Sequence, residues 1–255
     1  MAVKPEAMEK AALAHKPFFS SRTPIYLTGA NPFALPVWKL KEYIAILRKH
    51  FPNFSRISLQ SRIDDIAKKS DEELAELRDL GLSHLYIGTE NGNEDALALM
   101  DKGHTAKDTV EQLKRLDKSG FTYTNFYILG MAGKGNGQKS AKETAAMFNQ
   151  VHPSMITSTA ITLFDRAPVA EMARNGQFQQ PSEREMIEEL RTFLSELKID
   201  TYYDGVHYLN PVNYRFQTGN LEQKRKVLED IDDILATHSD EELEWIVDRK
   251  SKLSL

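Results

Sequence analysis

Short strand-like runs alternate with longer helix-like segments along most of this chain. Most of the runs end in glycine or a small polar residue, after which apolar residues recur at helical spacing. The runs are Ile25–Leu27, Arg56–Gln60, His84–Ile87, Thr122–Leu129 and Met155–Leu163. Strands separated by helices in this way predict an α/β fold with a parallel sheet, which either closes as a (β/α) barrel or stays open and doubly wound.

Serine residues mark the starts of several expected helices. Ser70, Ser182 and Ser239 are each followed three residues later by glutamate, which is the capping-box pattern. Apolar residues at helical spacing extend these and other segments. The expected helices span residues 38–51, 70–81, 93–100, 105–119, 140–151, 182–198 and 221–236, with a final helix from 239.

Aromatic residues crowd the sequence after residue 199, beside Gly205, Pro211 and Asn213. This composition predicts an irregular extension that folds back onto the body before the last two helices. We therefore expect two domains. The first is a partial barrel over residues 1–198, and the second is an aromatic-rich and helical C-terminal extension over residues 199–255.

The chain of 255 residues contains no cysteine. It therefore supplies no disulfide, thiolate nucleophile, zinc–thiolate site or cysteine-ligated iron–sulfur cluster. The seven histidines form no H-x-H or H-E-x-x-H pair, so we predict no metal site.

Charge and hydropathy limit the partners. The formal net charge of −4 argues against a nucleic-acid partner, which would need an excess of basic residues. The apolar runs are too short to span a bilayer, and the first residues lack the apolar core of a signal peptide. We therefore expect a cytoplasmic protein with no membrane partner.

Two polar segments that follow predicted strands are candidates for a site. Glu90 lies where a barrel presents acceptors to a ligand, although the same segment also suits a plain turn. Arg62 with Asp64 and Asp65 behind it makes either an ion pair or a clamp for a ligand carboxylate.

The glycine-rich segment Gly130–Gly137 also follows a strand. It lacks the Walker A and dinucleotide patterns, so we expect a flexible loop near a site rather than a phosphate cradle. Charged runs on the predicted helices, such as Glu183–Glu189, are typical of solvated helix faces.

Four segments, in order, resemble the radical SAM family, in particular its elongator-type and methylthiotransferase-type branch. The longest match is Tyr86–Gly92 with Lys102–Thr105 after it, which is similar to the family's I-G-x-E-S-G and M-x-(K/R)-G-H-T runs. The shorter matches are Ile25–Pro32, Phe126–Gly133 and Thr162–Pro168. The resemblance implies a partial (β/α) barrel of the radical SAM type, built around S-adenosylmethionine and an iron–sulfur cluster.

The chain departs from the family at its defining motif. The C-x-x-x-C-x-x-C run that holds the cluster has no counterpart here. Because Lys4–His15 resembles the helix after the cluster loop, we expect a truncated barrel that lacks its first strand. Asn31 stands where the first glycine turn usually has glutamate, and Ala132 and Lys134 stand where the adenine turn usually has proline and glutamate.

The resemblance also implies which residues contact the cofactor. They are Gly29, Ala30, Asn31, Gln60, Arg62, Glu90, Lys102 and Met131. The first three would face the methionyl amine of S-adenosylmethionine through backbone carbonyls, and the next two would reach its ribose or carboxylate. Glu90 and Lys102 occupy further polar positions, and Met131 borders the adenine. The resemblance assigns this chain no catalytic residue and no metal ligand.

We therefore predict a radical SAM-family protein of an iron–sulfur oxidoreductase lineage. This chain alone would be inactive, because electron injection into S-adenosylmethionine needs the cluster. One alternative is a small-molecule-binding or scaffold protein on a partial barrel. Another is an unrelated barrel enzyme that uses Glu90, Arg62 and a metal. In each case the expected partner is an unknown small molecule.

The missing first strand has a consequence for association. It would leave the edge of the Ile25–Leu27 strand open, and open apolar edges pair with other chains. We expect either a homodimer through this sheet edge or cover by residues 1–21, whose apolar side chains could shield it.

Overall fold

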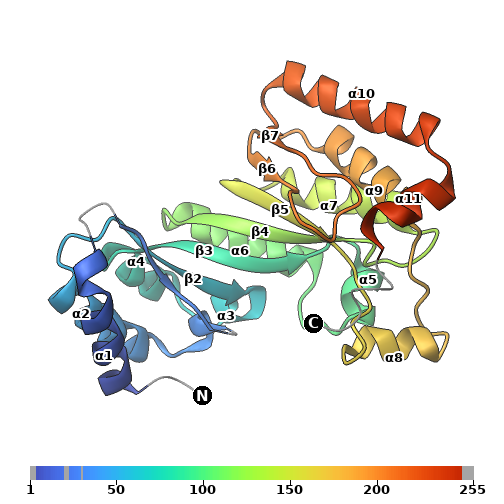
Figure 1. The fold of residues 1–255 in the computed structure, drawn as a ribbon. Coiled ribbons are helices and arrows are strands. Elements are labelled where there is room, and N and C mark those ends of the chain that lie inside the picture. The colour runs from blue at the N-terminus through green and yellow to red at the C-terminus, as the bar shows by residue number, and fades with distance from the viewer. Residues whose placement is uncertain (1–3, 20–22, 30, 249–255) are drawn as a thin grey trace. The chain divides into compact units, whose positions relative to one another are not determined.

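Seven strands form one sheet in the computed structural model, which describes residues 4–19, 23–29 and 31–248 (Figure 1). They are β1 (Ile25–Leu27), β2 (Ile57–Arg62), β3 (Leu82–Glu90), β4 (Thr122–Leu129), β5 (Met155–Ala160), β6 (Tyr202–Asp204) and β7 (Arg215–Gln217). Their order in the sheet follows the chain. The pairs β1–β2, β2–β3 and β5–β6 are parallel, and β6–β7 is antiparallel. The predicted α/β fold with a mostly parallel sheet is confirmed.

The chain divides into two compact units. Unit 1 comprises residues 1–88 and 111–124, and unit 2 comprises residues 89–110 and 125–255. Three elements begin in one unit and end in the other, namely β3, β4 and the helix α6 (Ala106–Lys118). The domain boundary expected at residue 198 stays a prediction.

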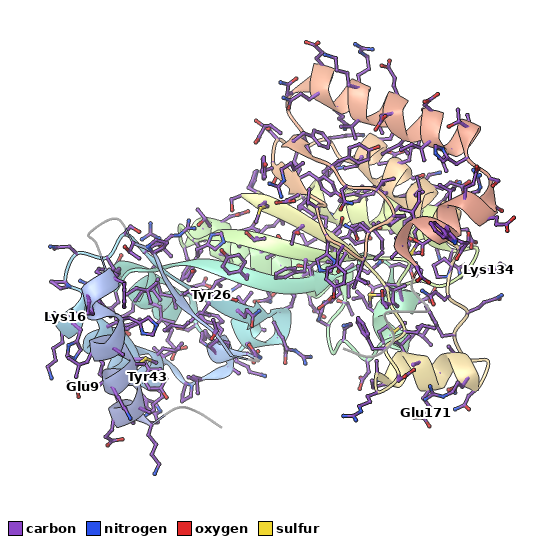
Figure 2. The ribbon with its side chains drawn as sticks, viewed as in Figure 1. Glu9, Lys16, Tyr26, Tyr43, Lys134 and Glu171 are labelled. Carbon is purple, nitrogen blue, oxygen red and sulfur yellow. The ribbon has the colours of Figure 1, made fainter. Side chains whose placement is uncertain are left out.

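Unit 1 holds β1, β2, most of β3 and the start of β4. Its other elements are α1 (Pro5–His15), α2 (Val37–His50), α3 (Ile63–Ala67), α4 (Asp71–Asp79) and two 3-10 turns, Lys16–Phe18 and Pro32–Ala34. The expected apolar stripe of α2 is buried at Leu40, Tyr43, Ile44 and Leu47. α1, which carries Glu9, packs along α2 (Figure 2). Glu9 accepts a hydrogen bond of 2.6 Å from Lys49 of α2.

Unit 2 packs its helices around an aromatic core. The ring of Phe193 lies with its centre 4.7 Å from that of Tyr127 on β4 and 6.5 Å from that of Tyr203 on β6. The helices are α5 (Glu94–Leu99), α7 (Gly137–Phe148), α8 (Pro168–Arg174), α9 (Glu183–Glu196), α10 (Leu221–Thr237) and α11 (Asp240–Val247). The capping boxes predicted at Ser70, Ser182 and Ser239 are all present.

The segment after residue 199 is more regular than its composition indicated. Tyr202–Asp204 pairs with β5, and Arg215–Gln217 pairs back on it. Tyr203 and Phe216 are buried while their neighbours along each strand are more exposed, which explains the pairing. In the described ranges, no helix combines the length and apolar character that a membrane crossing needs.

Candidate functional site

β3 ends in unit 2 at Glu90, at the carboxyl edge where parallel sheets place their sites. Glu90 has a φ of +70°, in the left-handed region that residues with a Cβ seldom adopt. This conformation costs about 1 kcal/mol or more, and such strain clusters at ligand sites. Glu90 is thus held in an unfavourable conformation at a position suited to a ligand.

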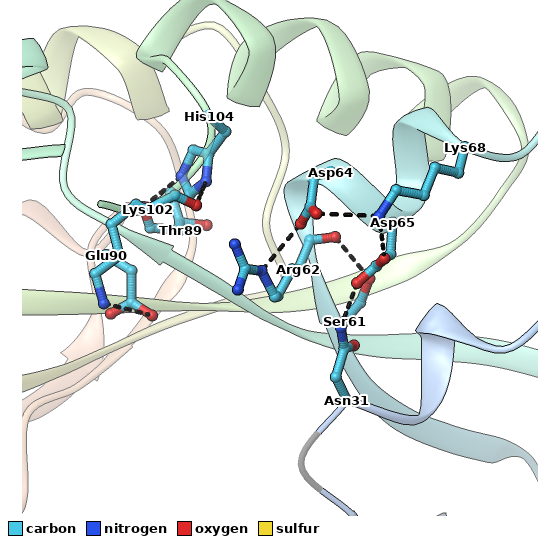
Figure 3. A network of polar contacts seen from close by, with 10 residues as sticks. All are labelled: Asn31, Ser61, Arg62, Asp64, Asp65, Lys68, Thr89, Glu90, Lys102 and His104. Carbon is cyan, nitrogen blue, oxygen red and sulfur yellow. Dashed lines mark hydrogen bonds and ion pairs between the residues drawn. The ribbon is translucent and has the colours of Figure 1, made fainter. Parts of the chain in front are cut away.

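The carboxylate of Glu90 faces Lys102 (Figure 3). Nζ of Lys102 lies 3.8 Å from Oε1 of Glu90, and both side chains are partly buried. This separation exceeds hydrogen-bond length, and a carboxylate has about four acceptor positions. Two of the predicted cofactor residues are therefore brought together with acceptor capacity to spare.

His104 ties the segment after Lys102 back to β3. Its Nε2 lies 3.3 Å from the carbonyl oxygen of Thr89, and its Nδ1 lies 3.2 Å from that of Lys102 (Figure 3). The ring thus lies between the residue before Glu90 and the residue that faces Glu90, and a neutral imidazole donates to one of these two carbonyls. This arrangement positions the pair and leaves His104 in a supporting role.

Met131 lies in an apolar cluster after β4. Its side chain is 1% exposed and packs with Ala96 and Leu97 of α5. Ile128, Ala132 and Met100 are only partly buried against this cluster. A ligand beside this turn would meet those three side chains before the thioether of Met131.

The glycine-rich turn after β4 uses its backbone N–H groups internally. Gly130 donates to Glu189 at 2.8 Å, Lys134 to the carbonyl of Gln179 at 2.8 Å, and Gly135 to Glu185 at 2.8 Å. Amide groups that are already bonded cannot cradle a phosphate. The sequence-based preference against a phosphate cradle agrees with these contacts, and Lys134 marks the turn in Figure 2.

The solvated face predicted for Glu183–Glu189 is wrong, because Glu183 and Glu189 are buried. Glu189 accepts hydrogen bonds from the Tyr127 hydroxyl at 2.6 Å and from Gly130 N. Burial raises the pKa of Glu189 to about 7, although those hydrogen bonds oppose the shift. Helical spacing was the overlooked signal, since Glu189 lies on the same stripe as Met186 and Phe193.

In unit 1, the turn after β1 carries an unsatisfied acceptor. Nδ2 of Asn31 donates to the buried carboxylate of Asp65, which also accepts a 3.0 Å bond from Lys68 (Figure 3). Oδ1 of Asn31 is buried and has no hydrogen-bond partner among the described residues. An orphaned acceptor two residues after Gly29 suits a ligand N–H group. Ala30 lies outside the described residues.

Arg62 makes an ion pair, which was the plainer of the two interpretations of this segment. Its Nε donates to Asp64 Oδ1 at 3.0 Å, and the Arg62 side chain is half-exposed. Partial burial works to raise the pKa of Asp64, but Lys68 and Arg62 lower it overall. Gln60 is half-buried on β2, in register with Tyr86 on β3. A cofactor contact by Gln60 or Arg62 stays a prediction.

The Radical SAM superfamily matches residues 2–147 of the sequence, which is more than half of the chain. This chain therefore belongs to the radical SAM superfamily, and the resemblance found in the motifs is confirmed. The interpretation as an unrelated barrel enzyme is accordingly excluded. The elongator-type branch stays a prediction.

Two curated proteins from archaea are similar in sequence. The uncharacterized protein MJ0486 of Methanocaldococcus jannaschii is 24% identical over 173 residues, which are 68% of this chain and 52% of that protein. A tRNA uridine(34) acetyltransferase of Methanocaldococcus infernus is 24% identical over 125 residues, which are 47% of this chain and 22% of that protein. The chain thus spans about half or less of these relatives' lengths.

Two solved structures share the fold. Elp3 of Methanocaldococcus infernus with an N-terminal deletion has a TM-score of 0.59 at 16% identity. The match covers 88% of this chain and 58% of the Elp3 chain. Coproporphyrinogen III oxidase (HemN) of Escherichia coli has a TM-score of 0.58 at 16% identity, covering 89% and 62%. The seven-strand sheet therefore matches partial barrels of radical SAM proteins.

The family uses S-adenosylmethionine and an iron–sulfur cluster, and the two fit this chain differently. No thiolate is available for the cluster, because the sequence has no cysteine. Within the described ranges, no group of three His, Asp or Glu side chains is arranged to hold a metal. S-adenosylmethionine fits better within unit 2, since Glu90 offers a carboxylate with spare capacity.

Proposed function

We propose that this chain binds S-adenosylmethionine, and that it does not cleave the cofactor reductively with its own residues. The observation that carries the proposal is the strained Glu90 after β3, held 3.8 Å from Lys102 inside the longest family motif. Radical chemistry would be supplied by a cluster bound to thiolates, and these 255 residues contain none.

The contacts in unit 2 support a polar end of the ligand. Glu90 can accept a hydrogen bond from a hydroxyl, and Lys102 can donate to an oxygen of the same molecule. The partly buried side chains around Met131 offer the apolar surface that a purine ring needs. Both features lie in unit 2, the first at the end of β3 and the second around the turn after β4.

Unit 1, taken by itself, offers a separate place for an amine. Oδ1 of Asn31 is an orphaned acceptor, and Asp65 adds negative charge beside it. Lys68 already offsets part of this charge at 3.0 Å. An ammonium would therefore be held mainly by hydrogen bonds rather than by a full ion pair.

Calorimetric titration with S-adenosylmethionine tests the proposal. Glu90→Ala should weaken binding by roughly 1–3 kcal/mol, because Lys102 and the ligand lose a partly buried partner. Glu229→Ala is the matched control, since it also removes an ion-paired glutamate, in this case from the exposed face of α10. Absence of binding by the wild-type chain, or an unchanged affinity for Glu90→Ala, would overturn the proposal.

The alternative of a small-molecule-binding or scaffold protein rests on the same strand ends. The absence of cysteine favours it, because binding without cleavage needs no cluster. The two proposals differ in ligand. The alternative would be supported if this chain did not bind S-adenosylmethionine but bound another small molecule in a Glu90-dependent way.

A further inference from the structure

A chain of buried polar side chains joins α9 to the turn that follows β3. Ser140 Oγ on α7 lies 3.4 Å from Glu189 Oε1 and 3.0 Å from Asn91 Oδ1. Thr144 Oγ1 lies 3.2 Å from the same amide oxygen and accepts a 2.9 Å bond from Gly92 N. The four side chains that form this chain, Asn91, Ser140, Thr144 and Glu189, are fully buried.

The backbone fits closely at the same place. A Cβ on Gly92 would lie 2.5 Å from the Cα of Thr144, so the turn rests directly on α7. Oδ1 of Asn91 also accepts a 2.8 Å bond from Asn93 N. Three donors therefore lie around the oxygen of the Asn91 amide and orient it. If one of them stops donating, the orientation of Asn91, the residue next to Glu90, should change.

The other end of this amide is unsatisfied. Nδ2 of Asn91 is buried and has no hydrogen-bond partner among the described residues. A buried donor without a partner is costly, and a ligand or water acceptor would relieve that cost. The orientation of the Asn91 amide thus bears directly on what the turn can bind.

The hydroxyl of Ser140 has one proton and two acceptors in reach, so it can donate to only one of them. An ionised Glu189 competes with Asn91 for this proton. A protonated Glu189 can instead donate to Ser140 Oγ, which leaves the Ser140 proton for Asn91 Oδ1. The two protonation states therefore hold the Asn91 amide differently.

The groups around Glu189 allow both states. β4 presents the Tyr127 hydroxyl, the following turn presents Gly130 N, and α7 presents Ser140. On α9 itself, Glu185 is bonded to Gly135 N. From α10 and α11, Asp232 and Asp240 pair with Arg191 and Arg184 of α9. Glu244 of α11 accepts a 3.1 Å bond from Glu183 N, and Lys224 of α10 donates to Ser195 O at 3.5 Å.

We infer that Glu189 is a positioning residue for the Glu90 turn, acting through Ser140 and Asn91, and that its proton is linked to ligand binding there. The identity of the ligand rests on the proposed function. The hydrogen-bond relay from Glu189 through Ser140 to Asn91 does not. Protonation strengthens the hold on Asn91 and should tighten binding. Because the pKa of Glu189 is raised to about 7, the change falls near neutral pH.

Nuclear magnetic resonance of the full chain tests the relay without a ligand. The side-chain amide of Asn91 and the backbone amide of Gly92 should titrate with the midpoint of the Glu189 carboxyl. Ser140→Ala should abolish that titration while Glu189 still ionises, and Glu188→Gln, on the neighbouring glutamate, should leave it intact. The inference would be overturned if the signals of Asn91 and Gly92 did not change at the Glu189 midpoint, or if they titrated unchanged in Ser140→Ala.

Calorimetry with S-adenosylmethionine across neutral pH then tests the link to binding. The wild-type affinity should rise roughly fivefold as Glu189 gains its proton, the effect of about one neutral hydrogen bond. Glu189→Gln, which keeps a donor at this position, should bind equally at all pH values. An affinity that does not vary with pH would refute the link and leave the proposed function standing. A working relay with no binding would refute only the proposed function.

Discussion

The ammonium group of Lys69 donates a 2.6 Å hydrogen bond to the carbonyl oxygen of Phe33 and lies 4.2 Å from the centre of that ring. Lys69 is buried, and this burial lowers its pKa although the charge of Asp65 opposes the shift. A buried lysine after α3 therefore fastens the 3-10 turn Pro32–Ala34, next to the candidate amine acceptor Asn31.

Lys69→Met should lower the free energy of unfolding by roughly 1–3 kcal/mol, because the Phe33 carbonyl loses its partner inside the fold. Lys41→Met, which removes an exposed lysine paired with Glu76, should cost under about 1 kcal/mol. Urea unfolding followed by circular dichroism measures both. Equal effects of the two substitutions would contradict the anchoring role.

Glu90→Gly should separate stability from binding. Glycine adopts a positive φ without steric cost, so the ligand-free variant should be more stable by roughly 0.5–1 kcal/mol. The same change removes the carboxylate that faces Lys102, so binding of S-adenosylmethionine should weaken. Thermal unfolding and calorimetry on one preparation provide both numbers. A less stable glycine variant would show that Glu90 is not strained.

The contribution of Glu189 to stability should depend on pH. Its pKa in the folded chain, about 7, lies above the ordinary value of 4.5, so the folded state binds the proton more tightly. The stabilisation is therefore complete below about pH 4.5 and is lost as the pH rises through about 7, at about 1.4 kcal/mol per unit. Glu189→Gln should flatten this part of the curve. Identical pH dependence of unfolding in the two chains would contradict the prediction.

Anaerobic reconstitution with iron and sulfide should leave this chain without a stoichiometric cluster, since it has no thiolate. Iron and sulfide analysis after desalting provides the measurement. A brown protein with stoichiometric iron and sulfide would contradict the prediction and would require ligands other than cysteine.

We propose that β1 is an open edge at which two copies pair. Ile25 N bonds to the carbonyl oxygen of Arg56, the residue before β2, so alternation turns the N–H of Tyr26 toward the other side. Tyr26→Pro should remove this outward donor, keep β1 on β2 and give a monomer. Tyr26→Ala, which loses the ring contact with Tyr86 but keeps the N–H, should stay dimeric. Light scattering that finds a monomeric wild-type chain would dismiss the proposal.

The N-terminal segment was the other candidate for covering this edge. Its described part packs on α2, and Phe19 contacts Phe51 with ring centres 4.3 Å apart. Residues 1–3 and 20–21 of the expected cover lie outside the described residues. Deleting the chain through Phe19 should expose α2 and lower solubility or raise the oligomeric state. If the deletion variant were as soluble as the intact chain and had the same oligomeric state, a covering role for the N-terminal segment would be contradicted.

The sequence predicted the strands that are long or bounded by clear turns. β1 to β5 overlap the predicted runs, although β3 is longer than expected and β5 ends earlier, at Ala160. The three capping boxes are where Ser70, Ser182 and Ser239 indicated. β6 and β7 have three residues each, too few for an alternating pattern to stand out in an aromatic segment. Their pairing depends on burial of Tyr203 and Phe216, which only the tertiary fold decides.

The candidate site was predictable where a single segment carries it. Glu90 and Lys102 stand out in one continuous motif, whereas Asn31 and Asp65 meet across 34 positions with no local signal. Glu189 was hidden by its neighbours, because a run of charged residues resembles a solvated face even when one member lies on the apolar stripe. Partners brought together by tertiary packing have no spacing that a sequence pattern can report.

The boundaries between the two units fall inside β3, α6 and β4 rather than in loops. A recombination joint at any of these places would cut a strand or a helix, and neither half could complete it alone. Exchange of one unit for a foreign counterpart is therefore disfavoured, as is insertion of a new module between them. Changes in what this chain recognises would then arise by substitution at the strand ends rather than by the shuffling of parts.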